Sequence, residues 1–404
     1  MKCGLLGKHL SHSYSPQIHG MLGAYPYTLF EKEPEEIAVF LQNGDFTGIN
    51  VTVPYKKTVI PYLDELSPVA RRMGAVNTVV RRNGKLIGHN TDYFGFQMMV
   101  QKSGLDVSGK KALVLGSGGA SNTAVAVLQD LGADVTVISR QGEHTYSNLH
   151  LHADASLIVN TTPVGMYPNN GESPVNLDQF THLEGVLDLI YNPAKTQLLL
   201  DAEKRNIPHV NGLLMLVAQA KESSEWFTDM MLSDDLIASI HNRLDKQMRN
   251  IILIGMPGSG KSTFGRLLAE KTGRKFVDAD LLIQQLAKKE IPEIFAQDGE
   301  EIFRDWETAA LAELGKQSGL IIATGGGCVT KERNFPLLHQ NGILFWLQRD
   351  LEKLPTDGRP LSQKGRLEEM FQARQPLYRS FADHIIDNNG LLSEAVSSIL
   401  EVLQ

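Results

Sequence analysis

Cysteine is scarce in this sequence, because 404 residues contain only Cys3 and Cys328. Two thiols this far apart do not form the disulfide framework of a small secreted domain, which favours a reducing compartment. Long apolar runs are lacking too, since no stretch approaches the roughly 18 uninterrupted apolar residues of a membrane-spanning helix. Residues 1–9 become charged before the apolar core of a signal peptide could form. We therefore expect a cytoplasmic protein without a membrane partner.

An excess of positive charge is also missing, because 46 acidic residues outnumber 39 basic ones and give a net charge of -7. Such a chain has no general attraction for nucleic acid, so we expect no nucleic-acid partner, and anionic ligands must be bound by local groups. What the chain does have is an ordinary globular composition, with 42% hydrophobic and 21% charged residues. Its length predicts two or three domains of about 100–200 residues each.

Apolar segments of strand length alternate with helical patterns along the chain, as at residues 112–115, 135–138, 157–159 and 251–254. This alternation predicts an α/β fold with parallel sheets. The first and last of these segments lead directly into glycine-rich turns followed by helix-forming sequence. Two strand–loop–helix units predict two nucleotide-binding sites.

Two further patterns predict how the chain is divided. Residues 76–90 form a predicted hairpin in a separate lobe, because Asn83-Gly84 suits the positive φ angles of a type I′ turn. A polar, helix-like stretch follows residue 234 and ends just before the strand at 251–254. We therefore place the junction between the two halves at residue 246.

Residues 255–262, GMPGSGKS, match the P-loop pattern GxxxxGK[ST] without a gap. In such a loop the glycines let backbone N–H groups converge on phosphate oxygens. The amine of Lys261 supplies positive charge near the β- and γ-phosphates, and the hydroxyl of Ser262 can ligate Mg²⁺. The pattern predicts an ATP or GTP site.

Polar residues elsewhere in this half predict the phosphate acceptor. Asp278 and Asp280 follow Phe276-Val277 at strand spacing, so we expect both carboxylates on one face of an extended segment. Two arginines and an open backbone accompany them: Arg304 in GEEIFR, the glycines 325–327 after a strand at 320–323, and Arg374 before QPLY. This combination suits a small hydroxy acid.

In this order, the motifs of residues 250–404 resemble the shikimate kinase family. The resemblance implies that Asp280 accepts the proton of the 3-hydroxyl of shikimate, that Asp278 helps to position Mg²⁺ through water, and that Arg359 closes over ATP as a lid arginine. The implied shikimate contacts are Arg304, Gly326, Gly327 and Arg374. The implied nucleotide contacts are Gly255, Gly258, Ser259, Gly260, Lys261, Ser262 and Thr263. One departure is that the short stretch 351–357 lacks an arginine that many family members place against adenine.

The other glycine loop, residues 116–121 (GSGGAS), is one residue off the dinucleotide fingerprint. A predicted strand precedes it, a helix follows it, and the next strand ends at Ser139-Arg140. An NAD site favours an acidic residue at that strand end, whereas a hydroxyl and a positive charge favour the 2′-phosphate of NADP. Alternatively, Arg140 is only a surface charge.

Polar segments on both sides of this loop carry hydroxyls, amides, one lysine and one carboxylate, a set suited to polyol binding and proton transfer. The segments are SHSYSP at 11–16, NVTVPYK at 50–56, GAVNT at 74–78, NTD at 90–92, DLIYNP at 188–193 and NGLLMLVAQA at 211–220. Together they resemble the shikimate dehydrogenase family across residues 1–246. The resemblance implies a substrate lobe at about 1–95 and 212–246 and a Rossmann-type NADP lobe at about 96–211.

Within this resemblance, Lys56 and Asp92 are the implied catalytic pair. Hydride transfer to a ketone leaves charge on oxygen, which a protonated Lys56 oriented by Asp92 can stabilise and neutralise. The implied substrate contacts are Ser13, Ser15, Thr52, Asn77, Tyr191 and Gln219, with the two serines on the carboxylate. The implied NADP contacts are Gly116, Gly118, Gly119, Ala120, Ser139, Arg140 and Met215.

The two halves together predict a bifunctional enzyme of chorismate and aromatic amino-acid biosynthesis. It would reduce 3-dehydroshikimate to shikimate with NADPH and then phosphorylate shikimate to shikimate 3-phosphate with ATP. Two alternatives stay open: an active kinase joined to a non-catalytic first half, and a first half that prefers quinate or NAD. A zinc site at His9, His12 and His19 is a weaker hypothesis, because these residues lack a carboxylate or thiolate partner at ligand spacing.

Overall fold

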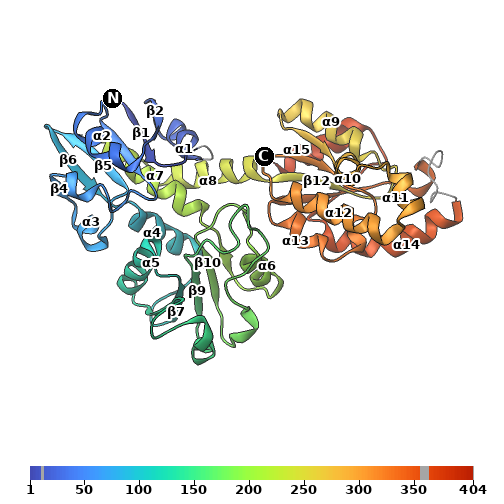
Figure 1. Ribbon diagram of the computed structural model, residues 1–404. Coiled ribbons are helices and arrows are strands. Elements are labelled where there is room, and N and C mark those ends of the chain that lie inside the picture. Colours follow the sequence, from blue (N-terminus) through green and yellow to red (C-terminus); the bar gives the residue numbers. More distant parts are fainter. Residues whose placement is uncertain (11–12, 355–363, 404) are drawn as a thin grey trace. The chain divides into compact units, whose positions relative to one another are not determined.

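The computed structural model describes residues 1–10, 13–354 and 364–403 (Figure 1). The chain divides into two compact units. Unit 1 comprises Met1–Val164, Ser173–Tyr191 and Asp201–Leu244, and unit 2 comprises Gly165–Glu172, Asn192–Leu200 and Asp245–Gln404. Within the described ranges, no helix is both long enough and apolar enough to cross a bilayer.

The first lobe of unit 1 is a six-stranded sheet in the order β2-β1-β3-β5-β6-β4. Its strands are β1 (Cys3–Gly7), β2 (Tyr27–Glu31), β3 (Gly48–Val51), β4 (Glu65–Leu66), β5 (Thr78–Arg82) and β6 (Lys85–His89), with α1 (Ser15–Leu22), α2 (Ile37–Asn43) and α3 (Pro68–Met73) as its helices. The predicted hairpin is confirmed: β5 and β6 pair antiparallel, and Asn83 and Gly84 both have positive φ. Leu6, Ile49 and Val79 pack with α2 in the core of this lobe.

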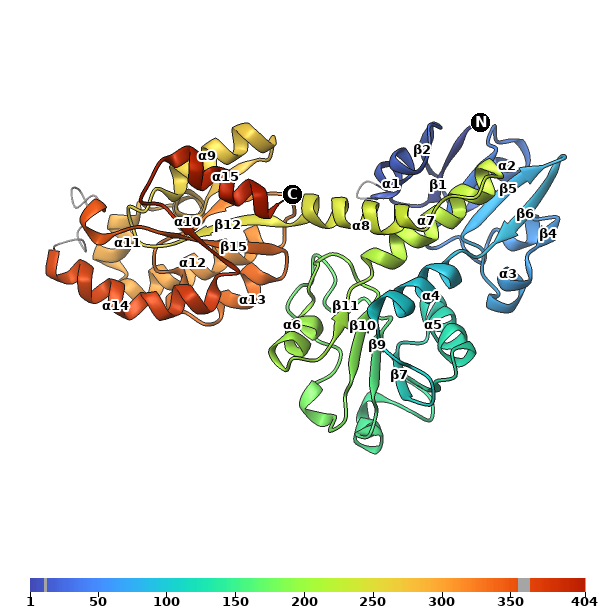
Figure 2. The ribbon, with the colours of Figure 1, turned by 180° about the vertical axis from the view of Figure 1, so that it is seen from behind.

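The second lobe of unit 1 is an all-parallel sheet in the order β11-β10-β9-β7-β8, seen from behind in Figure 2. Its strands are β7 (Lys111–Leu115), β8 (Asp134–Ile138), β9 (Leu157–Asn160), β10 (Gly185–Asp188) and β11 (His209–Val210). The helices that accompany it are α4 (Asp92–Ser103), α5 (Gly119–Asp130) and α7 (Leu213–Thr228), and α6 (Gln197–Lys204) begins in unit 2 and ends in unit 1. The strand–glycine loop–helix unit expected at residues 112–121 is β7 followed by α5.

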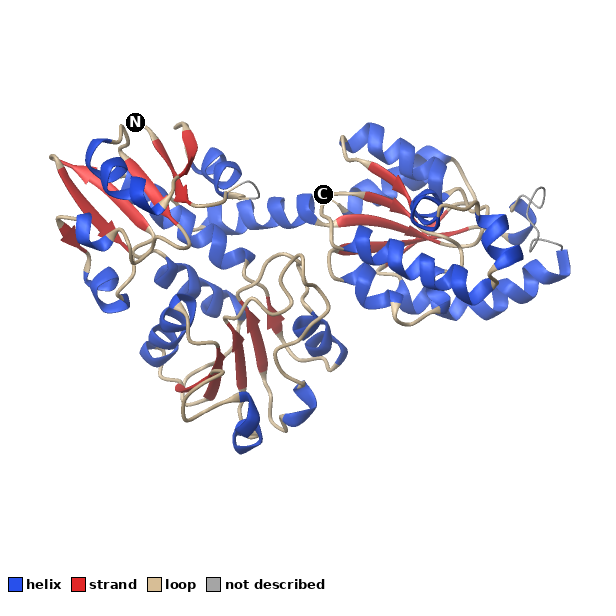
Figure 3. Cartoon of the chain, viewed as in Figure 1, coloured by secondary structure: helices blue, strands red, loops and turns tan. Residues whose placement is uncertain are grey.

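Unit 2 contains a third sheet, also all parallel, in the order β13-β14-β12-β15-β16 (Figure 3). The strands are β12 (Asn250–Ile254), β13 (Phe276–Asp278), β14 (Ile321–Ala323), β15 (Gly342–Gln348) and β16 (His384–Asp387). The helices are α9 (Lys261–Thr272), α10 (Ala279–Ala287), α11 (Ile291–Gln297), α12 (Glu300–Gly315), α13 (Asn334–His339), α14 (Lys364–Phe381) and α15 (Leu392–Val402). The polar helix expected after residue 234 is α8 (Asp235–Met248), which ends just before β12.

Helices cover both faces of the unit 2 sheet, so its central strand is buried on both sides. Successive residues of β12 point to opposite faces. Ile252 and Ile254 pack with Trp346 on one face, and Ile251 and Leu253 pack on the other. This packing explains why β12 reads as a continuous apolar run rather than an alternating one.

Candidate active sites

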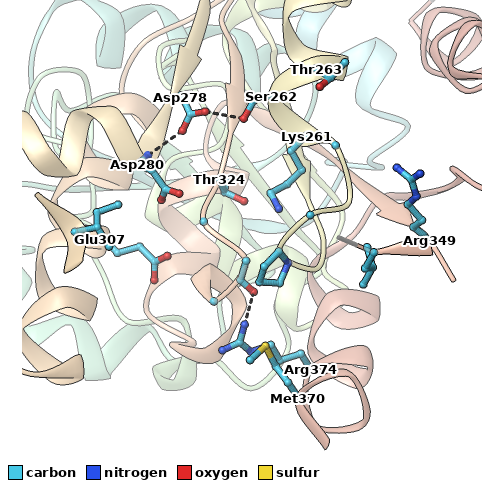
Figure 4. Close-up of a pocket in the computed structure, with 18 of the residues that line it drawn as sticks. Lys261, Ser262, Thr263, Asp278, Asp280, Glu307, Thr324, Arg349, Met370 and Arg374 are labelled. Atoms are coloured by element: carbon cyan, nitrogen blue, oxygen red, sulfur yellow. Dashed lines mark hydrogen bonds between the residues drawn. The ribbon is translucent and has the colours of Figure 1, made fainter. Parts of the chain in front are cut away.

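Unit 2 holds a cavity of about 830 Å³ at the carboxyl ends of its strands (Figure 4). The P-loop follows β12, Asp278 ends β13, the three glycines follow β14, and Arg349 follows β15. Because the strands are parallel, their carboxyl ends meet at one edge of the sheet, where α/β proteins bind their ligands. The architecture therefore collects residues from four distant segments around one space.

The P-loop has the backbone that its glycines predict. Gly255, Gly258 and Gly260 all have positive φ angles, which lie outside the range that other residues adopt readily. The ammonium group of Lys261 is buried and donates hydrogen bonds to the carbonyls of Gly255 and Met256, at 2.9 and 3.1 Å. Its charge is thus held against the loop, at the amino end of α9.

Asp278 and Asp280 both line the cavity, but the expectation that they share one extended segment is wrong. Strand β13 ends at Asp278, and Asp280 lies in the first turn of α10. The cause is helix capping: one carboxylate oxygen of Asp278 accepts a hydrogen bond from the backbone N–H of Asp280 at 3.1 Å. The other oxygen of Asp278 accepts one from the hydroxyl of Ser262 at 2.7 Å.

Arg304 and Arg374 contact the glycine turn from two helices. Arg374 donates a hydrogen bond at 3.1 Å to the carbonyl of Gly326, which also accepts one from the hydroxyl of Tyr378. The guanidinium group of Arg304 occupies the space where a side chain at Gly327 would lie, so any larger residue there would displace Arg304. The four predicted shikimate contacts are thereby brought to one wall of the cavity. Arg359 lies outside the described residues.

Glu307 is a buried carboxylate of this cavity that the sequence motifs did not single out. It accepts a hydrogen bond from Arg304 at 2.9 Å, one turn earlier on α12, and its side chain is fully buried. Burial raises the pKa of Glu307, and the positive charge of Arg304 opposes that rise. The i, i+3 spacing from Arg304 is the signal that could have identified it. Arg349, likewise not predicted, also lines the cavity.

In unit 1, Lys56 and Asp92 form a direct ion pair. The ammonium group of Lys56 lies 2.5 Å from one carboxylate oxygen of Asp92. The amide of Asn77 donates to the other oxygen at 2.9 Å, so both oxygens of Asp92 are held. The side chain of Lys56 is 30% exposed, which leaves its remaining N–H bonds accessible. The structure thus assembles three of the predicted site residues into one hydrogen-bonded group.

A buried network of hydroxyl and amide groups adjoins the Lys56–Asp92 ion pair. Its central residue is Ser223 on α7, whose hydroxyl contacts Asn50, Thr78 and Thr91 at 2.8, 2.8 and 2.9 Å. Thr91 also donates to the predicted substrate residue Gln219 at 3.5 Å. Ser223 was not predicted, because α7 carries several other polar residues and nothing in its sequence marks this serine as the buried one.

The remaining predicted substrate residues lie in neighbouring segments of unit 1. The hydroxyl of Ser13 accepts a hydrogen bond from the backbone N–H of Ser15 at 3.2 Å. Tyr14, between them, makes an edge contact with Tyr191, with ring centroids 6.1 Å apart. The backbone N–H of Thr52 donates to the carbonyl of Leu6 in β1.

His19 is a core residue of this lobe. It is stacked on Tyr27 and bonded through Nδ1 to the hydroxyl of Tyr25 at 2.7 Å. Burial lowers the pKa of its imidazole to about 3. The zinc hypothesis therefore loses one of its three histidines, and His12 lies outside the described residues.

The predicted NADP loop follows β7 and leads into α5. Gly116 has a positive φ and lies against Thr161, while the Cβ positions of Gly118 and Gly119 have no described atom within 4 Å apart from their chain neighbours and the backbone of α5 itself. The backbone at the amino end of α5 is therefore open to an anionic group. At the end of β8, Ser139 donates its N–H to the carbonyl of His144 and Arg140 is exposed. The two remaining predicted contacts are Ala120, in the first turn of α5, and Met215, which packs near the core of this lobe.

Known proteins match the two halves separately. A family model described as shikimate kinase matches residues 257–404, and one described as shikimate dehydrogenase substrate binding domain matches residues 5–79. A shikimate dehydrogenase (NADP(+)) of Clostridium beijerinckii is 34% identical over 269 residues, covering 61% of this chain and 98% of its own length.

Solved structures match the first half as well. Shikimate dehydrogenase 1 from Peptoclostridium difficile is 40% identical, with a TM-score of 0.55, covering 60% of this chain and 97% of its own. A chorismate mutase/shikimate 5-dehydrogenase fusion protein from Clostridium acetobutylicum is 36% identical, with a TM-score of 0.58, covering 61% and 97%.

Proposed function

The chain belongs to the shikimate dehydrogenase family over its first 60% and carries a shikimate kinase domain at residues 257–404, and on this premise we propose that it catalyses two successive reactions. The first is the NADPH-dependent reduction of 3-dehydroshikimate to shikimate. The second is the ATP-dependent phosphorylation of shikimate to shikimate 3-phosphate. The observation that carries the proposal is that each half has its own charged site, and that the product of one reaction is the substrate of the other.

In the reduction, NADPH supplies the hydride, and the chain supplies binding and the proton. The open amino end of α5 fits the pyrophosphate, and Ser139 and Arg140 at the end of β8 fit a 2′-phosphate. Lys56 donates its proton to the carbonyl oxygen as negative charge develops there. Asp92 orients the ammonium group, and Asn77 prevents Asp92 from rotating away.

In the phosphoryl transfer, the P-loop backbone and Lys261 would balance the charge of the ATP phosphates. The residues fit Mg²⁺: the hydroxyl of Ser262 would ligate the ion, and Asp278, 2.7 Å from that hydroxyl, would act through water. Arg304 and Arg374 hold the carboxylate and ring of shikimate against Gly326 and Gly327. Asp280 accepts the proton of the attacking hydroxyl. A non-catalytic first half is not favoured, because the Lys56–Asp92 pair is complete.

The decisive experiment is a one-pot incubation of the purified protein with 3-dehydroshikimate, NADPH and Mg-ATP. Formation of shikimate 3-phosphate supports both assignments, whereas accumulation of shikimate alone contradicts the kinase assignment. Lys56→Ala should abolish only NADPH oxidation, and Lys261→Ala only phosphorylation. The exposed lysines Lys57 and Lys271, each on the same segment as its partner, provide matched Ala controls that should retain both activities. Loss of both activities in either single variant would contradict the two-site assignment.

A further inference from the structure

A second carboxyl group lies close to the Lys56–Asp92 pair. Helices α4 and α7 approach each other at Gly95, where an added Cβ would lie 2.8 Å from the carbonyl of Met215 and 2.9 Å from Cβ of Gln219. One turn further along α7, Ser223 contacts Thr91, the residue before Asp92. Glu222 precedes Ser223 and lies one turn after Gln219, so this packing places it beside the first turn of α4.

Glu222 is half-buried, and most of the charged groups that act on it are negative. Its Oε2 atom is buried and has no hydrogen-bond partner among the described residues. From α4, Asp92 acts on it electrostatically, with Lys56 paired to that carboxylate. From α7, Lys221 and Glu225 act on it.

The charged neighbours on α7 are already paired with other groups. Lys221 bridges Glu225 at 2.9 Å and Asp234 at 2.8 Å. Glu225 also accepts the N–H of Leu232 at 2.7 Å. Two other elements that contact α7 carry ionisable groups. His19 on α1 is hydrogen-bonded to Tyr25, and Arg82 on β5 donates a hydrogen bond to the carbonyl of Trp226. These neighbouring cations among the described residues are therefore each paired with a group other than Glu222.

Burial, and then the charge of Glu225, raise the pKa of the Glu222 carboxyl to about 8, with Asp92 adding to the rise and Lys221 opposing it. At neutral pH this group is a neutral carboxylic acid, and it becomes charged at mildly alkaline pH. Perturbed ionisable groups next to catalytic groups are candidates for a role in the chemistry.

We propose that Glu222 is a positioning residue for the ketone reduction: its carboxyl group sets the negative charge beside the Lys56–Asp92 pair and thereby the pH range over which the reduction proceeds. This inference rests on the proposed dehydrogenase function. When Glu222 is neutral, Asp92 alone balances the ammonium of Lys56. When Glu222 is ionised, a second negative charge adds to the attraction on the ammonium group of Lys56, so the reduction extends to higher pH.

The test is the pH profile of kcat/KM for 3-dehydroshikimate reduction, from pH 6 to 10.5, in the full chain and in Glu222→Gln. Glutamine keeps the shape of the side chain but cannot ionise. We expect the alkaline limb of the Gln variant to move to lower pH by about half to one pH unit, with activity at pH 6.5 within about twofold of wild type. Glu222→Asp should restore most of the wild-type profile.

Glu184→Gln is the control, because Glu184 forms an exposed ion pair with Lys110 at the amino end of β10, at the opposite edge of that sheet from the ligand site. Its profile should match wild type. Superimposable profiles of wild type and Glu222→Gln would overturn the inference, as would an equal loss of activity at every pH, which indicates a structural role alone. Complete lack of ketone reduction by the wild-type protein would instead contradict the proposed function.

Discussion

Replacing Glu222 by glutamine should stabilise unit 1 by an amount that grows with pH. Burial and neighbouring carboxylates raise the pKa of Glu222 from 4.5 to about 8 in the folded protein. Between these values the folded chain holds a proton that the unfolded chain has lost, so the wild-type free energy of unfolding is fully present below pH 4.5 and falls as the pH rises towards 8. Glutamine never ionises, so the variant does not lose this stability.

The size of the effect follows from the same two pKa values. Their difference of about 3.5 corresponds to at most about 5 kcal/mol at about 1.36 kcal/mol per pKa unit. Relaxation of the protein around the charge reduces this bound, and we expect about 2–4 kcal/mol at pH 8.5. For a unit of this size such a gain raises Tm by roughly 5–15 °C.

Scanning calorimetry of the full chain at pH 5, 6, 7, 8 and 8.5 measures this difference. The transition of unit 1 is identified as the one that NADP⁺ shifts upward, since a ligand stabilises the unit that binds it. The unfolding temperatures of wild type and variant should be closest at pH 5 and should separate progressively as the pH rises to 8. A gap of constant size from pH 5 to 8.5 would refute the reasoning, because it would show that the substitution changes packing and not ionisation. Glu184→Gln, the surface control, should show no such divergence.

Three further predictions concern residues whose contacts are specific. Gly327→Ala should raise the KM for shikimate at least about tenfold in kinase initial-rate assays, with little change for ATP, because the added methyl displaces Arg304. Glu307→Gln should raise the same KM by about 10–100-fold by leaving buried Arg304 with less compensating charge, and shikimate titration calorimetry should show the same loss. Ser223→Ala should cost about 1–3 kcal/mol in urea unfolding and lower kcat for ketone reduction, because Thr91 loses its buried partner; unchanged kcat would contradict a supporting role.

Local sequence patterns predicted much of the fold and the site because they act over a few residues. An apolar run that ends in glycines at 255–260 dictates a strand followed by a phosphate-binding loop, and Asn83-Gly84 dictates a hairpin turn. The error at Asp280 also has a local cause. Two aspartates at positions i and i+2 are compatible both with a strand and with the capped start of a helix. Here Asp278 caps α10 by accepting a hydrogen bond from the N–H of Asp280, so the helix forms.

Residues whose role depends on distant partners were not predicted. Ser223 is an ordinary helical serine until α7 packs on Asn50, Thr78 and Thr91, which come from three other segments. Glu222 lies in the polar sequence Lys221–Glu225, which is typical of a solvated helix face, and its pKa is unusual only because of its burial and its charged neighbours in the fold. The free energy of such groups is set by burial and by neighbours, and neither is a property of the local sequence.

The two proposed sites complement each other in their handling of protons. Ketone reduction takes up one proton, which Lys56 delivers and, with a side chain 30% exposed, can regain from water. Phosphorylation of a hydroxyl releases one proton, which Asp280 accepts as the new bond to phosphorus forms. Above the second pKa of the phosphates, the two reactions together neither consume nor release a proton. Glu222 belongs to unit 1, so we expect its ionisation at mildly alkaline pH to change the rate of ketone reduction and not that of phosphorylation.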